Sequence, residues 1–280
     1  MFENTIPRLE DFSSKNDVSL PLFVFPSLKQ CGIVKHGFTT RRGGVSEGIF
    51  EALNLSFTRG DSRNAVEENY RRLAAALGVE YESFVFSDQT HTTNVARVGR
   101  KDRGNGILRE RQSRDVDGMV TDEKGVTLVT FFADCVPLYF VDPVRYAIGL
   151  SHSGWRGTVG RMGAVTLEKM AQEFGSNPED MICAVGPSIC RNCYEVGEDV
   201  AEEFLREFSG REKELLVKKE NGKYQLDLWR ANEIVLLEAG VRRENISVTE
   251  VCTCCNPKLL FSHRASQGKR GNLAAVLALQ

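Results

Sequence analysis

Three residues with metal-binding side chains interrupt apolar stretches of the chain. His91 stands in SDQTHTTNV, Cys135 in FFADCVPLY and His152 at the end of YAIGLSHSG, each on or beside a segment expected to form a buried strand. A buried polar group needs a partner. Two imidazoles and one thiolate suit zinc, and three protein ligands leave a fourth tetrahedral position for water or substrate. The spacing does not require a shared site, so three separate hydrogen-bonded core residues remain the alternative.

Asp134 directly precedes Cys135 and should point to the opposite face of a regular strand. From there its carboxylate could hydrogen-bond a ligand histidine and orient the ring. A buried aspartate satisfied by backbone amides is the alternative.

Basic residues that could hold an anion lie in three glycine-containing stretches. HGFTTRRGGVSEG offers His36 and Arg42, FSHRASQGKRGN offers Arg264 and Arg270, and GWRG offers Arg156 at the start of an expected helix. Guanidinium groups and free amides suit a phosphate or a carboxylate. Ordinary basic turns are the alternative interpretation.

The eight cysteines are expected to be thiols in a reducing compartment. CRNC, with Cys190 and Cys193, is a C-x-x-C motif, typical of half a zinc site or of a redox pair. A second cluster is CTCC, with Cys252, Cys254 and Cys255. We identify no second C-x-x-C to complete a four-cysteine set, and therefore expect packed or incidental thiols.

Composition limits the class of protein. The chain has 280 residues, 41% hydrophobic and 26% charged, with a formal net charge of −2. Such a chain can bury a large core, and it carries no global field that would attract nucleic acid or an anionic membrane. The N-terminus lacks the features of a secretory signal, and Asp134 and Pro137 interrupt the longest apolar run. We expect a cytoplasmic protein.

The patterns of apolar residues predict an α+β fold. Strands are expected in residues 21–26, 32–41, 82–98, 117–121, 126–141, 146–153, 181–186 and 246–251, and helices over 62–77, from 156 onward, over 201–208 and over 227–240. Residues 272–280 suit a final strand or a short helix. Because strands occur in runs as well as alternating with helices, we expect one layered domain with antiparallel or mixed sheets over residues 20–280. Residues 1–19 form a polar segment that we expect to be poorly ordered.

Five segments together resemble one family. QTHTTNV, ADCVPLYFVDP, GLSHSGWRGTVGRM, GPSICRNCYEVG and CTCCNPKLLFSHR are similar, in this order, to blocks of the laccase-domain purine nucleoside phosphorylases, the YfiH-like proteins long labelled polyphenol oxidases. The similarity runs from residue 36 to the C-terminal end of the sequence. It implies a single-domain four-layer α/β/β/α sandwich.

The resemblance also implies an activity and a site. His91, Cys135 and His152 would be the metal ligands, with zinc as the metal and copper a less favoured alternative. The implied activity is phosphorolysis of adenosine, inosine and 5′-methylthioadenosine, with hydrolytic deamination of adenosine. Purine nucleosides and phosphate would then be the binding partners. Many relatives carry T-G-R before the last apolar run, whereas this chain has Arg270, Gly271 and Asn272.

Other functions remain compatible with the residues. Cys135 could act as a nucleophile with a histidine as base, as in a hydrolase that edits a peptidoglycan precursor. A multicopper oxidase needs more histidines than the four present. A non-enzymatic binding module would need an exposed apolar patch. The sequence does not indicate the oligomeric state.

Overall fold

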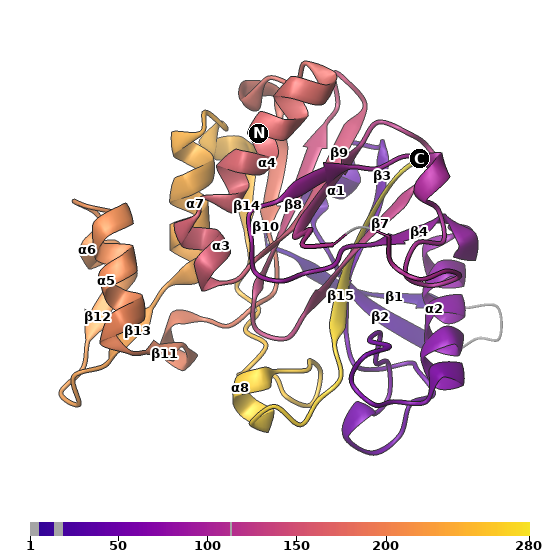
Figure 1. Ribbon diagram of the computed structural model, residues 1–280, viewed down its shortest axis with the longest axis horizontal. Coiled ribbons are helices and arrows are strands. Elements are labelled where there is room, and N and C mark those ends of the chain that lie inside the picture. Colours follow the sequence, from indigo (N-terminus) through magenta and orange to yellow (C-terminus); the bar gives the residue numbers. More distant parts are fainter. Residues whose placement is uncertain (1–5, 14–18, 113) are drawn as a thin grey trace.

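The computed structural model describes residues 6–13, 19–112 and 114–280 and shows two large mixed sheets (Figure 1). The first sheet contains, in spatial order, β1 (Arg8–Ser13), β2 (Ser19–Val24), β3 (Val34–Thr39), β15 (Leu273–Leu279), β7 (Thr127–Phe132) and β4 (Phe84–Phe86). Only the pairing of β4 with β7 is parallel within this described sheet. The strand β15 therefore lies near the centre of the sheet, between β3 and β7.

The second sheet has the order β14 (Ile246–Val248), β10 (Ile182–Val185), β8 (Val136–Asp142), β9 (Ala147–Ser153), β6 (Gly118–Thr121) and β5 (Val95–Arg97). Its outer pairs, β10 with β14 and β5 with β6, are parallel, and its inner pairs are antiparallel. A small antiparallel sheet follows, made of β11 (Glu195–Val196), β13 (Tyr224–Leu226) and β12 (Leu216–Lys218).

Helices pack around these sheets. They are α1 (Pro26–Gln30), α2 (Arg63–Leu77), α3 (Trp155–Val159), α4 (Met162–Phe174), α5 (Glu198–Glu207), α6 (Glu212–Leu215), α7 (Leu228–Glu238) and α8 (His263–Ser266). Figure 1 shows α2 on one side of the molecule and α4 and α7 on the other, with both sheets between them. This arrangement is the four-layer α/β/β/α sandwich that the resemblance implied.

The alternation of side chains along the strands explains these layers. In β15, Leu273, Ala275 and Leu277 face the core between the two sheets, whereas Ala274 and Val276 face α2. The strand β8 alternates in the same way, with Tyr139 and Val141 facing the other sheet and Leu138 and Phe140 facing α4 and α7. Successive residues of a strand point to opposite faces, so strands that are apolar throughout bury both faces.

The helix α2 forms where the sequence predicted it. Val66, Tyr70, Leu73 and Leu77 are buried on one face, and Gly78 ends the helix with φ of 62°. Glycine adopts this left-handed conformation without the steric cost that a side chain would impose.

Three expectations about the elements were wrong. Residues 82–98 form two short strands, β4 and β5, separated by a loop that carries His91. Residues 126–141 also form two strands, β7 and β8, because the chain turns at residues 133–135. Residues 8–13 of the supposedly disordered segment form β1, which pairs with β2 along its whole length. Residues 1–5 and 14–18 of that segment lie outside the described residues.

Within the described residues, no helix has both the length and the apolar character that crossing a bilayer requires.

Candidate active site and metal centre

The three candidate metal ligands lie together, although they come from three different elements. Their ligand atoms all lie within 4.8 Å of one another. Cys135 stands in the turn between β7 and β8, His152 near the end of β9, and His91 in the loop between β4 and β5. Because β8 and β9 pair so that Pro137 lies opposite His152, the register of this hairpin brings Cys135 beside the histidine.

Asp117 orders two of these three residues. One of its carboxylate oxygens lies 2.8 Å from Nδ1 of His152, and the same oxygen accepts the backbone N–H of His91. The other oxygen accepts the backbone N–H groups of Thr90 and Thr92. This carboxylate therefore fixes both the His152 ring and the loop that carries His91, including the left-handed backbone of His91 at φ of 67°.

Charges in the site depend on one another. Burial alone would raise the pKa of the Cys135 thiol, but His152 and His91 outweigh burial and lower the pKa to about 6. Burial alone would lower the pKa of His152, but the Cys135 thiolate and Asp117 raise it to about 9. Without a metal, the pair is therefore a thiolate beside an imidazolium. A bound cation would replace the proton that the imidazolium carries.

Gly154 lies close to two of the candidate ligands, so a side chain there would be crowded. A Cβ atom at this position would lie 3.0 Å from Cδ2 of His91 and 3.2 Å from Sγ of Cys135. The backbone of Gly154 is extended, at φ of −73° and ψ of −176°, a conformation open to any residue. A side chain at this position would therefore displace the side chains of His91 and Cys135 by a few tenths of an ångström, so limited space and not backbone conformation favours glycine here.

A cavity of about 280 Å³ opens beside the three candidate ligands. Its lining combines the trio with aromatic, hydroxyl, amide and guanidinium groups, namely Ser56, Thr58, Arg59, Gln89, His91, Arg111, Phe131, Phe132, Ala133, Cys135, His152, Arg270 and Asn272. Its volume is near the lower end of the range for small-molecule sites, about 300 Å³.

The arginines make the cavity electropositive. Arg270 is largely buried, and burial followed by repulsion from Arg59 lowers its pKa to about 10. Its Nε atom is buried and has no hydrogen-bond partner among the residues that the structure describes. A buried donor without a partner is costly, and an anion in the cavity would satisfy it. Arg111 pairs with Asp88 at 3.1 Å and lies over the Phe131 ring.

Asp134 does not make the expected contact with a ligand histidine. Its backbone is left-handed, with φ of 94°, because it lies in the turn and not in a regular strand. Its two carboxylate oxygens accept the Thr253 hydroxyl and the backbone N–H of Arg264, each at 2.7 Å. The carboxylate thus connects this turn to the chain after β14, and Asp117 has the role expected of Asp134.

Of the five residues expected to bind phosphate, only Arg270 lines the cavity. The side chain of Arg264 instead donates to the backbone oxygens of Cys193 and Glu195. His36 is buried and accepts the backbone N–H of Phe25. Arg42 lies in a different surface depression, beside Gly43 and Glu51. Arg156 stacks on the neighbouring Trp155 ring at 4.2 Å.

Several residues of the site were not identified from the sequence. Asp117 directly precedes the buried strand β6, and the criterion applied to His91 and Cys135, a polar residue beside an apolar run, would have found it. Arg59 and Arg111 lie in loops far from Arg270 in the sequence, and no local pattern indicates that they converge. Asn272 directly precedes β15, and its backbone N–H donates to the side chain of Asn54.

Comparisons with known proteins agree with this fold. The family described as "Multi-copper polyphenol oxidoreductase laccase" matches residues 35–280. The purine nucleoside phosphorylase YlmD of Bacillus subtilis (strain 168) is 38% identical over 87% of this chain and 88% of its own. A protein named adenosine deaminase RL5, from an unknown prokaryotic organism, is 34% identical over 81% of this chain and 87% of its own.

A solved structure is also closely similar. The hypothetical protein YfiH of Bacillus licheniformis superposes with a TM-score of 0.88 at 34% identity, covering 92% of this chain and 96% of its own. The resemblance drawn from the five sequence blocks is therefore confirmed. The chain belongs to the laccase-like family of YfiH and YlmD, whose curated relatives include enzymes named purine nucleoside phosphorylase.

Proposed function

We propose that this chain is a zinc-dependent purine nucleoside phosphorylase that acts on adenosine, inosine and 5′-methylthioadenosine and also deaminates adenosine. The observation that carries the proposal is that one cavity joins the His91, Cys135 and His152 cluster to the guanidinium groups of Arg59, Arg111 and Arg270. The names of the relatives support the substrate class. We place the enzyme in a reducing compartment such as the cytoplasm, which suits eight free thiols.

The residues of the trio fit a catalytic zinc ion. One thiolate and two imidazoles are the ligand types that zinc prefers, and three of them leave one coordination position open. Asp117 would hold the His152 ring so that Nε2 faces the ion, in the way that carboxylates support zinc-bound histidines. When bound, the ion would supply Lewis-acid polarisation of the purine or of a water molecule.

Phosphate would be held by the arginines. The partnerless buried Nε of Arg270 and the repulsion between Arg270 and Arg59 both favour an anion between these side chains. In phosphorolysis, a phosphate oxygen forms a bond to C1′ of the ribose while the C1′–N9 bond breaks and the purine takes up a proton. Fixing the phosphate beside the nucleoside supplies much of the catalysis in such a two-substrate reaction.

The purine would lie against the aromatic wall of the cavity. Phe131 is fixed because the Gln89 side chain both accepts its backbone N–H at 2.7 Å and donates to its backbone oxygen at 2.8 Å. The guanidinium of Arg111 lies 5.4 Å from the centre of the Phe131 ring. A flat apolar surface beside these polar groups suits a nucleobase, which combines an apolar face with a polar edge.

Deamination needs a proton carrier that the motifs do not supply. Known zinc nucleobase deaminases use a glutamate in H-x-E, and neither ligand histidine of this chain has one. Asp134, the carboxylate directly before Cys135, already accepts hydrogen bonds at both oxygens. We therefore assign Asp134 to positioning the turn that carries Cys135.

The test is incubation of the purified enzyme with adenosine, with and without phosphate. Adenine and ribose 1-phosphate should form in equal amounts only when phosphate is present, and inosine should form without it. Cys135→Ala should abolish both reactions and remove the active-site zinc.

Each result separates the candidates. Substrate hydrolysis without phosphate dependence and without inosine would favour a hydrolase. If Cys135→Ala keeps its full phosphate-dependent release of adenine, the site assignment fails.

A further inference from the structure

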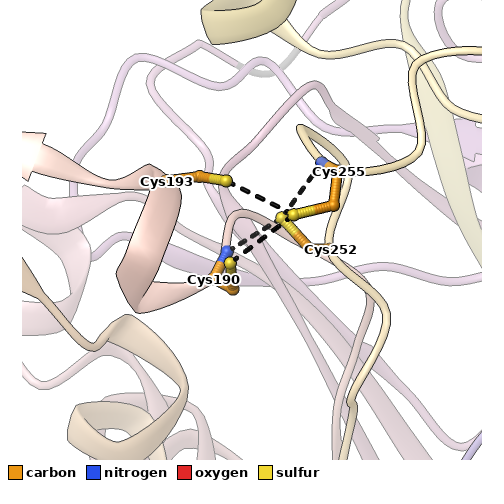
Figure 2. A group of neighbouring side chains, drawn as sticks. All are labelled: Cys190, Cys193, Cys252 and Cys255. Carbon is orange, nitrogen blue, oxygen red and sulfur yellow. Dashed lines mark hydrogen bonds between the residues drawn. The ribbon is translucent and has the colours of Figure 1, made fainter.

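A second group of metal-binding side chains lies outside the cavity lining. Cys190 and Cys193 follow β10, and Cys252 and Cys255 follow β14 (Figure 2). The strands β10 and β14 are parallel neighbours, so the loops after them leave the same edge of the second sheet. All four sulfur atoms lie within 4.8 Å of one another, although the two pairs are about sixty residues apart in the sequence.

The distances between the sulfurs fit coordination to one ion. Sγ of Cys255 lies 3.4 Å from Sγ of Cys193 and 4.0 Å from Sγ of Cys190. Four thiolates at zinc–sulfur distances of about 2.3 Å, arranged as a tetrahedron, lie about 3.8 Å apart. A disulfide would require about 2.05 Å. The observed separations lie near the first value and far from the second.

Backbone amides converge on one of the sulfurs. The N–H groups of Cys190 and Cys255 both donate to Sγ of Cys252, at 3.3 Å and 3.4 Å. Donors of this kind favour the thiolate, which is the form that binds a metal. The backbone also fixes the two loops to each other, because the N–H of Thr253 donates to the oxygen of Ser188 at 3.1 Å.

The expectation that no second C-x-x-C accompanies CRNC was wrong. Cys252 and Cys255 are themselves such a pair, within CTCC, where the intervening Cys254 obscures the spacing. The chain therefore carries two C-x-x-C motifs, and the fold brings them face to face (Figure 2). Paired C-x-x-C motifs are typical of structural zinc sites.

We propose that Cys190, Cys193, Cys252 and Cys255 hold a second zinc ion with a structural role. Four protein ligands close the coordination sphere, so this ion has no open position for a substrate or for water. The proposal does not depend on the catalytic function, because none of these four residues lines the cavity described above.

The ion would brace one wall of the active site. The backbone oxygen of Asp134 accepts the N–H of Ile189, directly before the first ligand pair. The carboxylate of Asp134 accepts the hydroxyl of Thr253, inside the second pair. Both loops therefore hold the turn that carries Cys135, and fixing them to one ion would fix that turn.

The experiment counts zinc in the purified protein. Wild-type chain should contain about two zinc ions, and Cys255→Ser and Cys193→Ser about one each. Cys135→Ala should also contain about one, and the double variant Cys135→Ala/Cys255→Ser about none. The matched control is Cys254→Ser, which alters the neighbouring thiol in the same loop and should keep both ions. Cys255 is exposed, so its substitution by serine should be tolerated by the fold.

A second measurement identifies the ligands independently of activity. In the Cys135→Ala background, cobalt added in place of zinc should give intense thiolate-to-metal absorption, which Cys255→Ser should abolish and Cys254→Ser should not. Wild-type protein with a single zinc ion that is lost in Cys135→Ala would overturn the proposal. Iron in place of zinc would also overturn it, as would a loss of zinc in Cys254→Ser equal to that in Cys255→Ser. So would fewer than eight titratable thiols in metal-stripped, denatured protein isolated without reductant, because missing thiols would indicate a disulfide.

The two proposals fail in different ways. Wild-type protein that holds two zinc ions but does not phosphorolyse nucleosides would count against the catalytic proposal alone. Wild-type protein that is fully active but holds one zinc ion, which is lost only in Cys135→Ala, would count against the second site alone.

Discussion

Nδ1 of His152 lies 2.8 Å from a carboxylate oxygen of Asp117, and both side chains are almost completely buried. This contact leaves Nε2 of His152 as the ring nitrogen directed to Cys135 and a metal. The same carboxylate holds the loop of His91 through three backbone N–H groups. One buried aspartate thus determines the positions of two of the three candidate ligands.

Asp117→Asn should weaken zinc binding at the trio. An amide has nearly the same shape, but it accepts hydrogen bonds more weakly and carries no negative charge to favour a cation bound by the histidine. Loss of such a supporting group typically lowers metal affinity by about 10- to 100-fold. Competition with a chelator would measure the change. Asp142→Asn is the control, because Asp142 is a buried carboxylate that accepts two backbone N–H groups in the β8–β9 turn, and it should leave zinc affinity unchanged.

Arg270→Gln should raise the KM for phosphate. The substitution removes a buried cation whose Nε lacks a partner in the described part of the chain. A hydrogen bond to a charged group contributes about 1.5–3 kcal/mol, which corresponds to roughly a 10- to 150-fold change. Initial rates at varied phosphate concentration would measure it. Arg42→Gln removes an arginine that lies outside the cavity, and an equal effect there would contradict the placement of phosphate.

His36 should make the protein less stable in acid. Burial, with a smaller contribution from Lys29, lowers its pKa from 6.5 to about 4. Above pH 6.5 the imidazole is neutral in both states. As the pH falls toward 4, only the unfolded chain gains the proton, so the free energy of unfolding decreases by on the order of 3 kcal/mol. Urea unfolding at pH 4 to 7 would measure this decrease, and His36→Gln should lack that part of it. An unchanged slope in the variant would refute the assignment.

Cys135 should react as a thiolate at unusually low pH once the metal has been removed. Burial opposes ionisation, but His152 and His91 lower the pKa of the thiol to about 6. The thiolate is the nucleophile, so alkylation by iodoacetamide should rise with pH through about 6 and then level off. Peptide mass spectrometry would follow the rate. At Cys31, where burial raises the pKa of the thiol, the rate should still rise above pH 8. Added zinc should protect Cys135.

The layers of the fold could be predicted from local patterns. Buried segments such as residues 136–141 and 273–279 are apolar throughout, and α2 repeats its apolar residues on one face. The loops followed no such pattern. The stretch around His91 contains β-branched residues typical of strands. Its backbone N–H groups nevertheless donate to the carboxylate of Asp117, 26 residues from His91, and the stretch forms a loop. The strand propensity of a short segment does not determine its structure when a buried carboxylate accepts the backbone N–H groups of that segment.

The candidate site was predictable only in part, for a related reason. Residue type identified His91, Cys135 and His152, because polar side chains in apolar segments need partners. The convergence of Arg59 with Arg270 depends on where β15 lies in the first sheet, and the sequence alone does not determine strand order. His36 and Arg42 had suitable side chains. His36 is buried by the pairing of β3 with β15, however, and Arg42 follows β3 in a part of the chain that lies away from the cavity.

The central position of β15 has a consequence for synthesis on the ribosome. Residues 273–279 are translated after every other strand that the structure describes, yet they fill the gap between β3 and β7. Until they emerge, β3 and β7 each present an unpaired edge, and Arg270 and Asn272 are not yet beside the other cavity residues. From the synthesis of β7, which ends at Phe132, until that of β15, the nascent chain therefore carries two open strand edges, a state in which pairing with another chain competes with folding.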